Sequence, residues 1–492
     1  MGGGLMQLVA YGTQDVYLTG NPQITFFKVV YRRHTNFSIE PIQQTFNGIA
    51  SFGRFVSTTI SRNGDLLYRM YVVTTLPSVP ANGYDQFRWL NWVGHILINY
   101  AEIVIGGQKI DRHYGHWLHI WNELTQTFGH QAGYATMVGN VPKLVQSTID
   151  GTPQVKLFIP LRFWFNRNPG LALPLVALQY HDVQINLQFA NKEDCYWSSS
   201  QNRIPDELVD ASLWVDYIYL DTDERRRFAQ ASHEYLIEQL QFNGAEPTTS
   251  TNAQIKMAFN HPVKEIIWTT QKDSVINSEI MKDYGGQQWF NFTDSIDYTY
   301  FSGTPQDPLG GGIGTAAYNS GNWFHSLPMT GIANGSFATA GQYGQVGSQS
   351  LNALNFNDLF GANPSDPLSR AWTAQLPVFD SGENPTEFGK IQLNGHDRLA
   401  QREGRYFNTV IPQECHENCP ATGINVYSFA LKPEDHQPSG TCNFSRVDIA
   451  TLLLTLTQQT LAEGDTAKTR IYCTNYNILR IMSGMAGLAF SN

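Results

Sequence analysis

Apolar and polar side chains alternate strictly along several short stretches of the chain. The clearest case is 183–189 (VQINLQF), where four apolar residues share one face of an extended segment and three amides share the other. Alternation of this kind predicts a β-strand that buries one of its faces. Further strands are predicted at 66–75, 213–220, 263–270, 424–431, 450–457 and 469–482.

Two stretches carry the pattern of a β-hairpin. In 102–110 (EIVIGGQKI), Gly106 and Gly107 separate two short strand-like runs, and paired glycines suit a two-residue turn. In 147–159 the dipeptide Asp150-Gly151 stands in the same kind of position. Many short strands with turn residues between them predict an all-β sandwich or barrel.

Helical patterns are few. Trp117, Trp121 and Leu124 fall on one face at i, i+4 and i+7 within 115–124, which predicts an amphipathic helix there. The stretch 223–240 opens with acidic residues, as helices often do, and lies near the middle of the chain. We therefore interpret 223–240 as a helical connector between two β-domains, although no internal repeat is visible in the sequence.

A long region, 283–369, contains no lysine or arginine and is rich in Gly, Asn and Ser. A structureless loop of this length is uncommon inside a compact domain and usually has a function. Disorder is the simpler interpretation. Aromatic residues within the region favour an elaborated, ordered loop that projects from the second domain.

Composition narrows the functional classes. Charged residues form 15% of the 492 positions, against about 25% in a typical soluble domain, and the formal charge is -10. A protein that reads the DNA backbone needs a basic field, so direct nucleic-acid binding is not expected. The one basic cluster, 225–227, follows three acidic residues and is interpreted as self-neutralising. Five cysteines suit a reducing compartment better than a disulfide scaffold, and neither a signal peptide nor a membrane span is expected.

The stretch 425–446 (NVYSFALKPEDHQPSGTCNFSR) gathers the residue types of a catalytic site. Asp435, His436 and Ser439 lie together in it, but they share one connector that follows Pro433. A catalytic triad needs its members held in fixed geometry on a rigid frame, which proximity in sequence does not supply. These residues are interpreted as turn chemistry.

Two histidine motifs raise the possibility of a metal site. His113, His116 and His119 would share about one third of a helix surface, so a common ligand is conceivable. No carboxylate or cysteine completes the set, and a half-buried, hydrogen-bonded histidine row is the preferred interpretation.

The second motif is CHENC (415–419), which is a lone pair of cysteines around His416 and favours a loop. Gly389-Lys390 lacks the glycine spacing of a phosphate-binding loop. The sequence therefore predicts no catalytic residue, no metal and no cofactor, and the protein is not expected to be an enzyme.

Several long stretches carry a family resemblance, and they are spread from one end of the chain to the other. They are 2–48, 59–72, 173–189, 425–446 and 476–492. Together they resemble the major capsid proteins of nucleocytoplasmic large DNA viruses, in particular those of mimiviruses and marseilleviruses. The glycine-rich part of the long loop, about 303–350, lies outside this resemblance.

The resemblance implies two tandem eight-stranded antiparallel jelly-rolls with short helices in their loops. It implies an N-terminal arm at 1–25, a first jelly-roll at 26–222, the connector at 223–240, and a second jelly-roll at 241–492 with an outward tower at about 283–369. Three chains would form a homotrimer with a pseudo-hexagonal outline. Such capsomers would tile the icosahedral capsid of a large double-stranded DNA virus.

The resemblance also implies partners and a location. The chain would contact copies of itself, minor capsid and penton proteins, an internal virion membrane indirectly, and the host surface through its outer loops. It would reside in the virion after assembly in the host cytoplasm. Two alternatives remain: a carbohydrate-binding β-sandwich that stacks sugars on Trp289, Trp323 and Trp372, and a receptor-binding virion surface protein.

Overall fold

The computed structural model describes residues 3–81, 86–199, 207–297 and 382–490. Most of the predicted loop region 283–369, together with Trp323 and Trp372, lies outside these residues. The chain forms two compact units, 1–37 and 38–492. The first unit contains the short helices α1 (Gly3–Val9) and α2 (Val16–Thr19), neither of which buries a residue.

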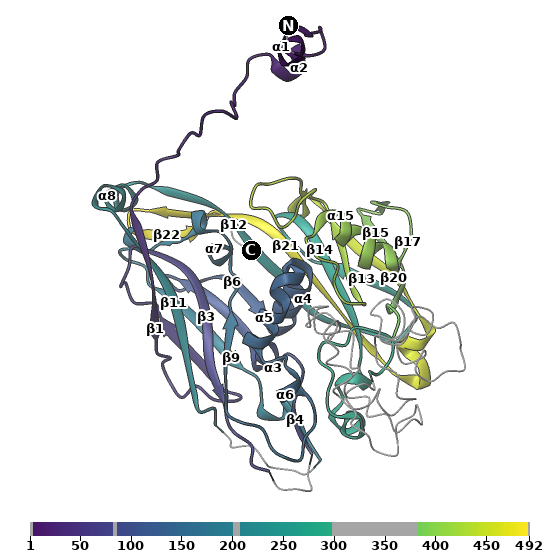
Figure 1. The fold of residues 1–492 in the computed structure, drawn as a ribbon. Helices are drawn as coiled ribbons and strands as arrows, with labels where there is room; N and C mark the ends of the chain where they lie inside the picture. Colours follow the sequence, from purple (N-terminus) through teal and green to yellow (C-terminus); the bar gives the residue numbers. More distant parts are fainter. Residues whose placement is uncertain (1–2, 82–85, 200–206, 298–381, 491–492) are drawn as a thin grey trace. The chain divides into compact units, whose positions relative to one another are not determined.

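The first half of the larger unit is a sandwich of two antiparallel sheets (Figure 1). One sheet has the order β1-β11-β3-β7, with the short β8 beside β3, and the other has the order β2-β9-β5-β6. The strands are β1 (Phe37–Gln44), β2 (Phe55–Thr59), β3 (Leu66–Leu76), β5 (Ile98–Ile105), β6 (Gln108–Tyr114), β7 (Val155–Pro160), β8 (Leu173–Pro174), β9 (Val183–Phe189) and β11 (Asp210–Leu220).

Short helices and a small two-stranded sheet fill the connections of this first sandwich. The helices are α3 (Val93–Leu97), α4 (Gly115–Thr125), α5 (Phe128–Val138), α6 (Pro142–Val145), α7 (Trp164–Arg167), η1 (Pro169–Leu171), η2 (Leu175–Ala177) and η3 (Lys192–Asp194). The small sheet pairs β4 (Phe87–Trp89) with β10 (Tyr196–Ser198). Helix α8 (Thr222–Gln230) leads into the second half of the chain.

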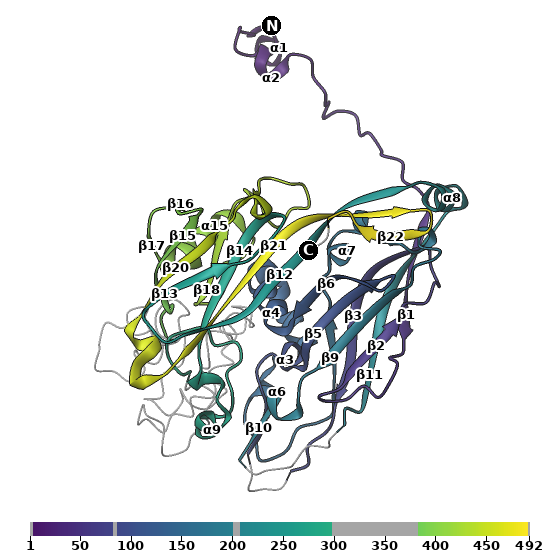
Figure 2. The ribbon, with the colours of Figure 1, turned by 180° about the vertical axis from the view of Figure 1, so that it is seen from behind.

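The second half forms another antiparallel sandwich, visible from behind in Figure 2. Its sheets have the orders β12-β21-β14-β18 and β13-β20-β15-β16. The strands are β12 (His233–Thr248), β13 (Asn252–Met257), β14 (Pro262–Lys272), β15 (Thr386–Leu393), β16 (His396–Asp397), β18 (Ile424–Ser428), β20 (Ala450–Leu456) and β21 (Ala467–Met482), with β17 (Arg402–Glu403), β19 (Cys442–Asn443) and β22 (Met485–Leu488) at their margins. The helical segments are η4 (Ser274–Ile276), α9 (Ser278–Met281), η5 (Lys282–Tyr284), η10 (Tyr406–Val410), α15 (Ile411–Cys415), η11 (Phe444–Arg446) and η12 (Gln458–Gly464).

The two sandwiches have the same strand order. When the eight principal described strands of each half are counted along the chain, both halves read 1-8-3-6 in one sheet and 2-7-4-5 in the other. This is the arrangement of a jelly-roll, in which eight antiparallel strands wind into two facing sheets. The fold is therefore a double jelly-roll, as expected. The repeat of one fold in the two halves is not visible in the sequence but is evident from their shared strand order.

Several sequence predictions are confirmed and two are corrected. Strand β9 and helix α4 match the predicted segments, and Gly106 and Gly107 turn the chain between β5 and β6 with φ values of 57° and 82°. The prediction of a hairpin at 147–159 is wrong. Gly151 does adopt a turn conformation, but Thr148 pairs with Phe87 and Thr152 pairs with Val79, not with each other.

The helix predicted across 223–240 is only half correct. Helix α8 ends at Gln230, and most of the remainder is the start of β12, which pairs with β21 at 233–242 and, after a bulge, at 245–248. The cause is tertiary pairing: a sixteen-residue partner strand supplies backbone hydrogen bonds that outweigh local helix propensity.

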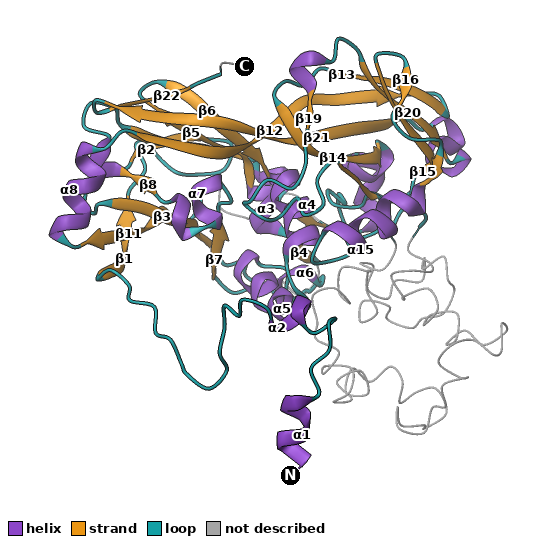
Figure 3. Ribbon diagram, turned by 90° about the horizontal axis from the view of Figure 1, so that it is seen from above, coloured by secondary structure: helices purple, strands orange, loops and turns teal. Residues whose placement is uncertain are grey.

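The hydrophobic core does not stop at the boundary between the sandwiches. One buried cluster fills the interior of the second jelly-roll around Trp268 and Leu452. A larger cluster fills the first jelly-roll and continues into residues of the second half, among them Ile237, Tyr472 and Leu479. The strands β12 and β21 run from one sandwich to the other and carry these residues (Figure 3).

Candidate functional site: the seam between the two sandwiches

We call the contact surface between the two jelly-rolls the seam. Strand β6 with helices α4 and α7 forms its first side, and its second side consists of β12, β14, β21, residues 282–297 and residues 411–434. Aromatic rings occupy its centre. Tyr472 stacks on Phe242 with ring centroids 4.7 Å apart, and it also lies 5.6 Å from Trp117 of α4. Because Trp117 and Tyr472 are almost fully buried, the two sandwiches share apolar surface that is removed from water.

Backbone and side-chain hydrogen bonds cross the seam beside these rings. The amide N–H of Leu240 donates to Asp111 Oδ1 at 3.0 Å, and the side chain of Gln239 donates to the carbonyl oxygen of Ile110. Farther along, Asn418 Nδ2 donates to the carbonyl oxygen of Glu123 at 2.8 Å. These directional bonds fix the register of one sandwich against the other, which apolar contact alone does not do.

A buried charge cluster lies on the same surface. Glu238 of β12 lies 2.7 Å from Arg167 of α7 and 2.7 Å from Lys264 of β14. The Lys264 side chain is fully buried and also donates to the carbonyl oxygen of Pro433 at 2.5 Å. Arg167 stacks over the ring of Trp121 at 3.9 Å, which adds a cation–π contact. Glu238 therefore compensates two cations that come from opposite sides of the seam.

A second buried cluster joins one histidine to two carboxylates. His416 lies between Glu265, at 3.1 Å from its Nε2, and Glu434, at 2.8 Å from its Nδ1. Burial alone would lower the pKa of His416, but hydrogen bonds and charge from Glu265 and Glu434 raise it to about 9. Burial alone would raise the pKa of Glu265, but His416 and Lys264 lower it. The arrangement is a buried Glu–His–Glu ion triad.

The stretch 425–446 contributes to this triad through a residue that the sequence did not single out. Glu434 accepts from His416 and from the backbone N–H of Glu417. Asp435, His436 and Ser439 were considered as a catalytic triad. Ser439 accepts a hydrogen bond from the backbone N–H of Lys432 and donates one to its carbonyl oxygen. No described interaction links Ser439 to Asp435 or His436. No local pattern points to Glu434, because its partners His416 and Glu417 lie 18 and 17 positions away in the chain.

The histidine row is divided between two elements. His113 lies on β6, not on helix α4, and pairs with Asp111 at 2.9 Å. His116 and His119 lie on α4 and face the rings of Phe290 and Phe292. The helical-face prediction is therefore wrong for His113, because the hairpin strand β6 extends to Tyr114.

No group of three or more His, Cys, Asp or Glu side chains able to hold a metal ion occurs in the described ranges. In the same ranges, no helix has the length and apolar character needed to cross a membrane. Trp289, considered as a sugar platform, is partly buried, and its indole N–H donates to the carbonyl oxygen of Asp194 at 2.9 Å.

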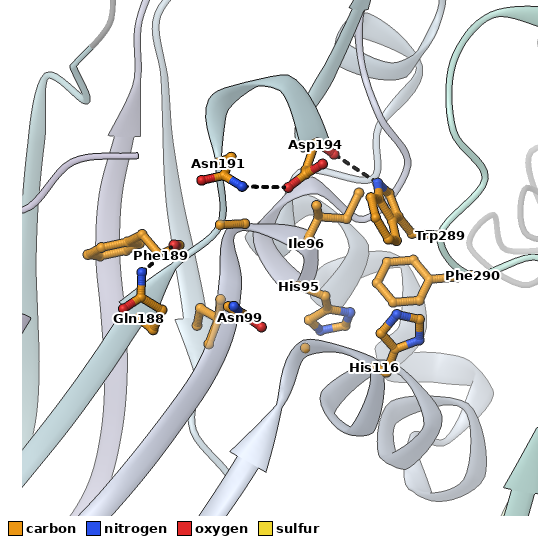
Figure 4. A pocket seen from close by; sticks show the side chains of 13 residues that line it. His95, Ile96, Asn99, His116, Gln188, Phe189, Asn191, Asp194, Trp289 and Phe290 are labelled. Atoms are coloured by element: carbon orange, nitrogen blue, oxygen red, sulfur yellow. Dashed lines mark hydrogen bonds between the residues drawn. The ribbon is translucent and has the colours of Figure 1, made fainter. Parts of the chain in front are cut away.

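A pocket of about 180 Å³ opens at one end of the seam (Figure 4). Its first-sandwich wall comes from α3, β5, α4, β9 and the turn that contains Asn191 and Asp194. Its second-sandwich wall consists of Trp289 and Phe290. Burial is the main cause that lowers the pKa of His95 to about 3 and holds the pKa of His116 well below its ordinary value, so both pocket histidines are uncharged at neutral pH.

Two jelly-rolls of one strand order, locked together through a buried seam, place the chain in the double jelly-roll class of proteins. Two family models match consecutive parts of it. "Major capsid protein N-terminus" covers residues 25–221 and "Large eukaryotic DNA virus major capsid protein" covers residues 224–487. The chain belongs to the major capsid proteins of large eukaryotic DNA viruses, and it is a structural protein of the virion capsid.

Individual relatives agree along the whole length. The chain is 48% identical to the major capsid protein of Phaeocystis pouchetii virus and 40% identical to that of Paramecium bursaria Chlorella virus 1, with all of each chain covered. It is 38% identical to capsid protein 1 of Acanthamoeba polyphaga mimivirus, again over full lengths.

Solved structures agree with the fold. A quasi-atomic model of the PBCV-1 virus capsid matches with a TM-score of 0.67 and 34% identity, covering 95% of this chain and 100% of the other. The Faustovirus major capsid protein has only 12% identity, covers 96% of this chain and 94% of its own, and has a TM-score of 0.66. This second match supports the double jelly-roll fold alone.

Proposed function

We propose that the chain forms a homotrimer that serves as a pseudo-hexagonal capsomer. The observation that carries the proposal is the repeated strand order of two sandwiches that share one continuous buried cluster. Because each chain supplies two similar and firmly joined units, three chains related by a threefold axis supply six. Contacts around such an axis are heterologous, and the rotation closes the ring.

The buried charge clusters support a fixed angle between the sandwiches. A tile that must match identical neighbours on every side needs one inter-sandwich angle, and buried ion pairs tolerate misalignment poorly. Arg167, Glu238 and Lys264 meet only when both jelly-rolls are correctly placed. The seam is thus suited to keep all six units of a capsomer in one geometry.

Native mass measurement of the purified protein tests the proposal. The expected species is about 166 kDa, three times the chain mass of 55.3 kDa. Negative-stain images of the same sample are expected to show particles of hexagonal outline. A species that remains at the mass of one chain across micromolar concentrations would contradict the trimer.

We further propose how the chain is divided into structural parts. Residues 1–25 are proposed as an arm, 26–222 as the first jelly-roll and 241–492 as the second. The separate N-terminal unit extends to Phe37, where β1 begins, so the arm is proposed to include 26–36 as well. The connector proposed at 223–240 is in essence helix α8, because β12 already begins at His233. The region at about 283–369 is proposed as the outward tower, through which the capsid could contact the host surface.

The N-terminal unit supports a role for the arm in contacts between chains. It exposes many large apolar side chains, such as Tyr17 at 92% and Phe27 at 98%. It also carries a net charge of +2, from three basic residues and Asp15, whereas the rest of the chain carries -12. Removal of residues 1–36 is expected to leave the jelly-rolls folded and to weaken association between capsomers, as measured by light scattering of assembled sheets. If association between capsomers is unchanged by the truncation, the proposed role of the arm in these contacts is wrong.

Minor capsid and penton proteins are the proposed neighbours of the assembled tile, and an internal membrane is a proposed indirect neighbour. Assembly in the host cytoplasm is supported by the five free cysteines, which fit a reducing compartment. Two of the thiols, Cys195 and Cys473, are buried, and burial raises their pKa, so they act as small apolar core residues.

A further inference from the structure

The outer faces of two equivalent sheets have different surroundings. The sheet β1-β11-β3-β7 of the first jelly-roll and the sheet β12-β21-β14-β18 of the second have the same strand order. The sheet of the second jelly-roll packs its outer face against the first jelly-roll, at the seam. Strands β1, β11 and β3 of the first sheet lie on the left of Figure 1, on the far side from the second jelly-roll.

One row of side chains shows how the outer face is built at the seam. The strand register places four apolar residues side by side across β12, β21, β14 and β18: Phe242, Tyr472, Ile267 and Val426. Each belongs to the cluster that fills the first jelly-roll or packs against it. Tyr472 meets Trp117 of α4, and Ile267 and Val426 are fully buried. A helix of the neighbouring sandwich therefore keeps water from this row.

The first jelly-roll carries a similar row, which remains partly exposed. The register places Trp214, Tyr71 and Pro160 side by side across β11, β3 and β7, and all three are only partly buried. Phe158 lies on the same side of β7 as Pro160, is 38% exposed, and has its ring centroid 6.3 Å from that of Tyr71. We call these four residues the aromatic face. A sheet face that meets only water normally carries polar side chains, so the aromatic face indicates a contact surface.

Charged side chains of both signs surround the aromatic face on the same strands. Arg69 of β3, Lys156 of β7 and Asp210 of β11 are exposed. Asp216 of β11 is partly buried and feels the charge of Arg69. An apolar centre within a polar, solvent-accessible rim is the composition of a protein–protein interface.

The seam indicates which surface covers the aromatic face. In the seam, the fifth principal strand of the first jelly-roll, β6, and the helix after it, α4, cover strands one and eight of the second, β12 and β21. The corresponding part of the second jelly-roll is β16 with the helical segments after it, η10 and α15. This part exposes an apolar side chain of its own, Val410, at 42%. A head-to-tail contact that uses one pair of surfaces repeatedly closes into a ring.

We propose that the aromatic face binds the second jelly-roll of another copy of this chain, through β16, η10 and α15. The inference rests on the proposed homotrimer and states which surfaces join its chains. Three seams within chains then alternate with three similar contacts between chains around the ring. Removal of the partly exposed rings from water stabilises each contact, and aromatic side chains at the centre of an interface carry much of its binding energy.

Native mass measurement over a range of concentrations tests the contact. Phe158→Glu changes a side chain that reaches solvent in the single chain, but in the proposed contact it buries a carboxylate without a partner. The concentration at which half of the chains are trimeric is expected to rise at least about a hundredfold. Ile280→Glu, at a 44% exposed position on α9 and outside both surfaces, is the matched control and should assemble as the unaltered protein does. Thermal unfolding checks that both variants are folded.

The outcomes separate this contact from the trimer itself. If the unaltered chain forms trimers and Phe158→Glu forms them equally well, the assigned surface is wrong and the trimer stands. If the unaltered chain stays at the mass of one copy, the proposed capsomer fails as well.

Cross-linking identifies the opposite surface. A photo-crosslinking phenylalanine analogue replaces Phe158, and trimers are assembled from isotopically heavy and light chains, so that mass spectrometry recognises links between chains. Links from position 158 to residues 396–415 of another chain are expected, since these residues span β16, η10 and α15. Links confined to one chain, links to the first jelly-roll of another chain, or no link in a trimeric sample overturn the proposal, even if Phe158→Glu fails to fold.

Discussion

At the scale of single residues, the ion triad of His416 with Glu265 and Glu434 makes the stability of the fold depend on pH. Its three charged groups are held at 2.8 Å and 3.1 Å, and the side chains of His416 and Glu265 are fully buried. Two carboxylates facing one imidazole favour its charged form. The triad is stable only while His416 carries a proton.

The first prediction concerns pH. The pKa of His416 is about 9 in the folded protein and 6.5 in the unfolded chain, so its contribution is complete below pH 6.5 and is lost as the pH rises through 9. At about 1.4 kcal/mol for each pKa unit, the free energy of unfolding should fall by about 3 kcal/mol across this window. Denaturant titrations at several pH values between 6.5 and 9.5 measure this fall in the free energy of unfolding.

Two variants separate His416 from other titrating groups. In His416→Gln the fall across this pH window should be much smaller, although the protein is less stable throughout because two carboxylates lose their cation. His34→Gln, at an exposed position in the N-terminal unit, should retain the full pH dependence. An identical slope in His416→Gln and the unaltered protein would show that the triad does not control it.

The second prediction concerns the charge cluster at Glu238. Glu238→Gln leaves Lys264 and Arg167 without their carboxylate, and loss of one partner from a buried pair costs about 3–5 kcal/mol. Glu246→Gln, at an exposed position on the same strand, should change stability by less than about 0.5 kcal/mol. Denaturant curves of Glu238→Gln, Glu246→Gln and the unaltered protein give the free energies of unfolding that test this difference. A small effect of Glu238→Gln would mean that water already reaches the cluster.

These polar residues mark the limit of what sequence patterns predict. A pattern of apolar positions shows which face of a strand is buried, and it predicts that charged side chains on the strand face the solvent. Glu238, Lys264 and Glu265 lie on strands and are charged, yet they are buried. Their partners come from other elements, as His416 does for Glu265. The seam could therefore not be derived from local sequence, whereas two of the strands near it, β14 and β21, were predicted from theirs.

At the scale of elements, the β5–β6 hairpin shows how one turn holds both halves together. Gly106 and Gly107 both adopt positive φ, as a two-residue turn between twisted strands requires. The Cβ position of Gly106 lies against the ring of His181, whose Nδ1 contacts the backbone of Ala486 on β22. The turn therefore packs against a residue that links the first jelly-roll to the second.

The third prediction compares the two glycines. Gly107→Ala meets nothing within 4 Å and should cost only the strain of its backbone conformation, about 1–2 kcal/mol. Gly106→Ala would also push the His181 ring away from Ala486, and overpacking typically adds about 1–3 kcal/mol. Thermal and denaturant unfolding of both variants give the difference. Equal losses would show that His181 moves aside freely.

Elements with a strong local pattern were predicted well, and those decided by distant pairing were not. Strand β9 alternates strictly and was placed to the residue, whereas the beginning of β12 was assigned to a helix. Nothing in 233–240 reveals that β21, more than 230 positions away, will pair with it. The failed hairpin at 147–159 has the same cause, because its two sides find partners at Val79 and Phe87.

At the scale of the whole molecule, the continuous core implies that the two jelly-rolls unfold together. The larger cluster includes residues from both halves, and Tyr472 lies where they meet, 1% exposed and in contact with Phe242 and Trp117. Sandwiches that share buried apolar surface stabilise each other, so opening one exposes part of the other.

The fourth prediction is that removal of the Tyr472 ring uncouples the sandwiches. In the unaltered protein, amide hydrogen exchange of β9 and of β20 should report the same free energy of opening, because one cooperative event exposes both strands. In Tyr472→Ala the two values should separate. Phe407→Ala removes an equally buried ring that packs on Trp268 inside the second jelly-roll, so it should lower stability by a comparable amount, about 3–5 kcal/mol, without opening a similar gap. If β9 and β20 already differ in the unaltered protein, the seam joins two independently stable domains, and the rigid capsomer would have to derive its fixed angle from contacts between chains.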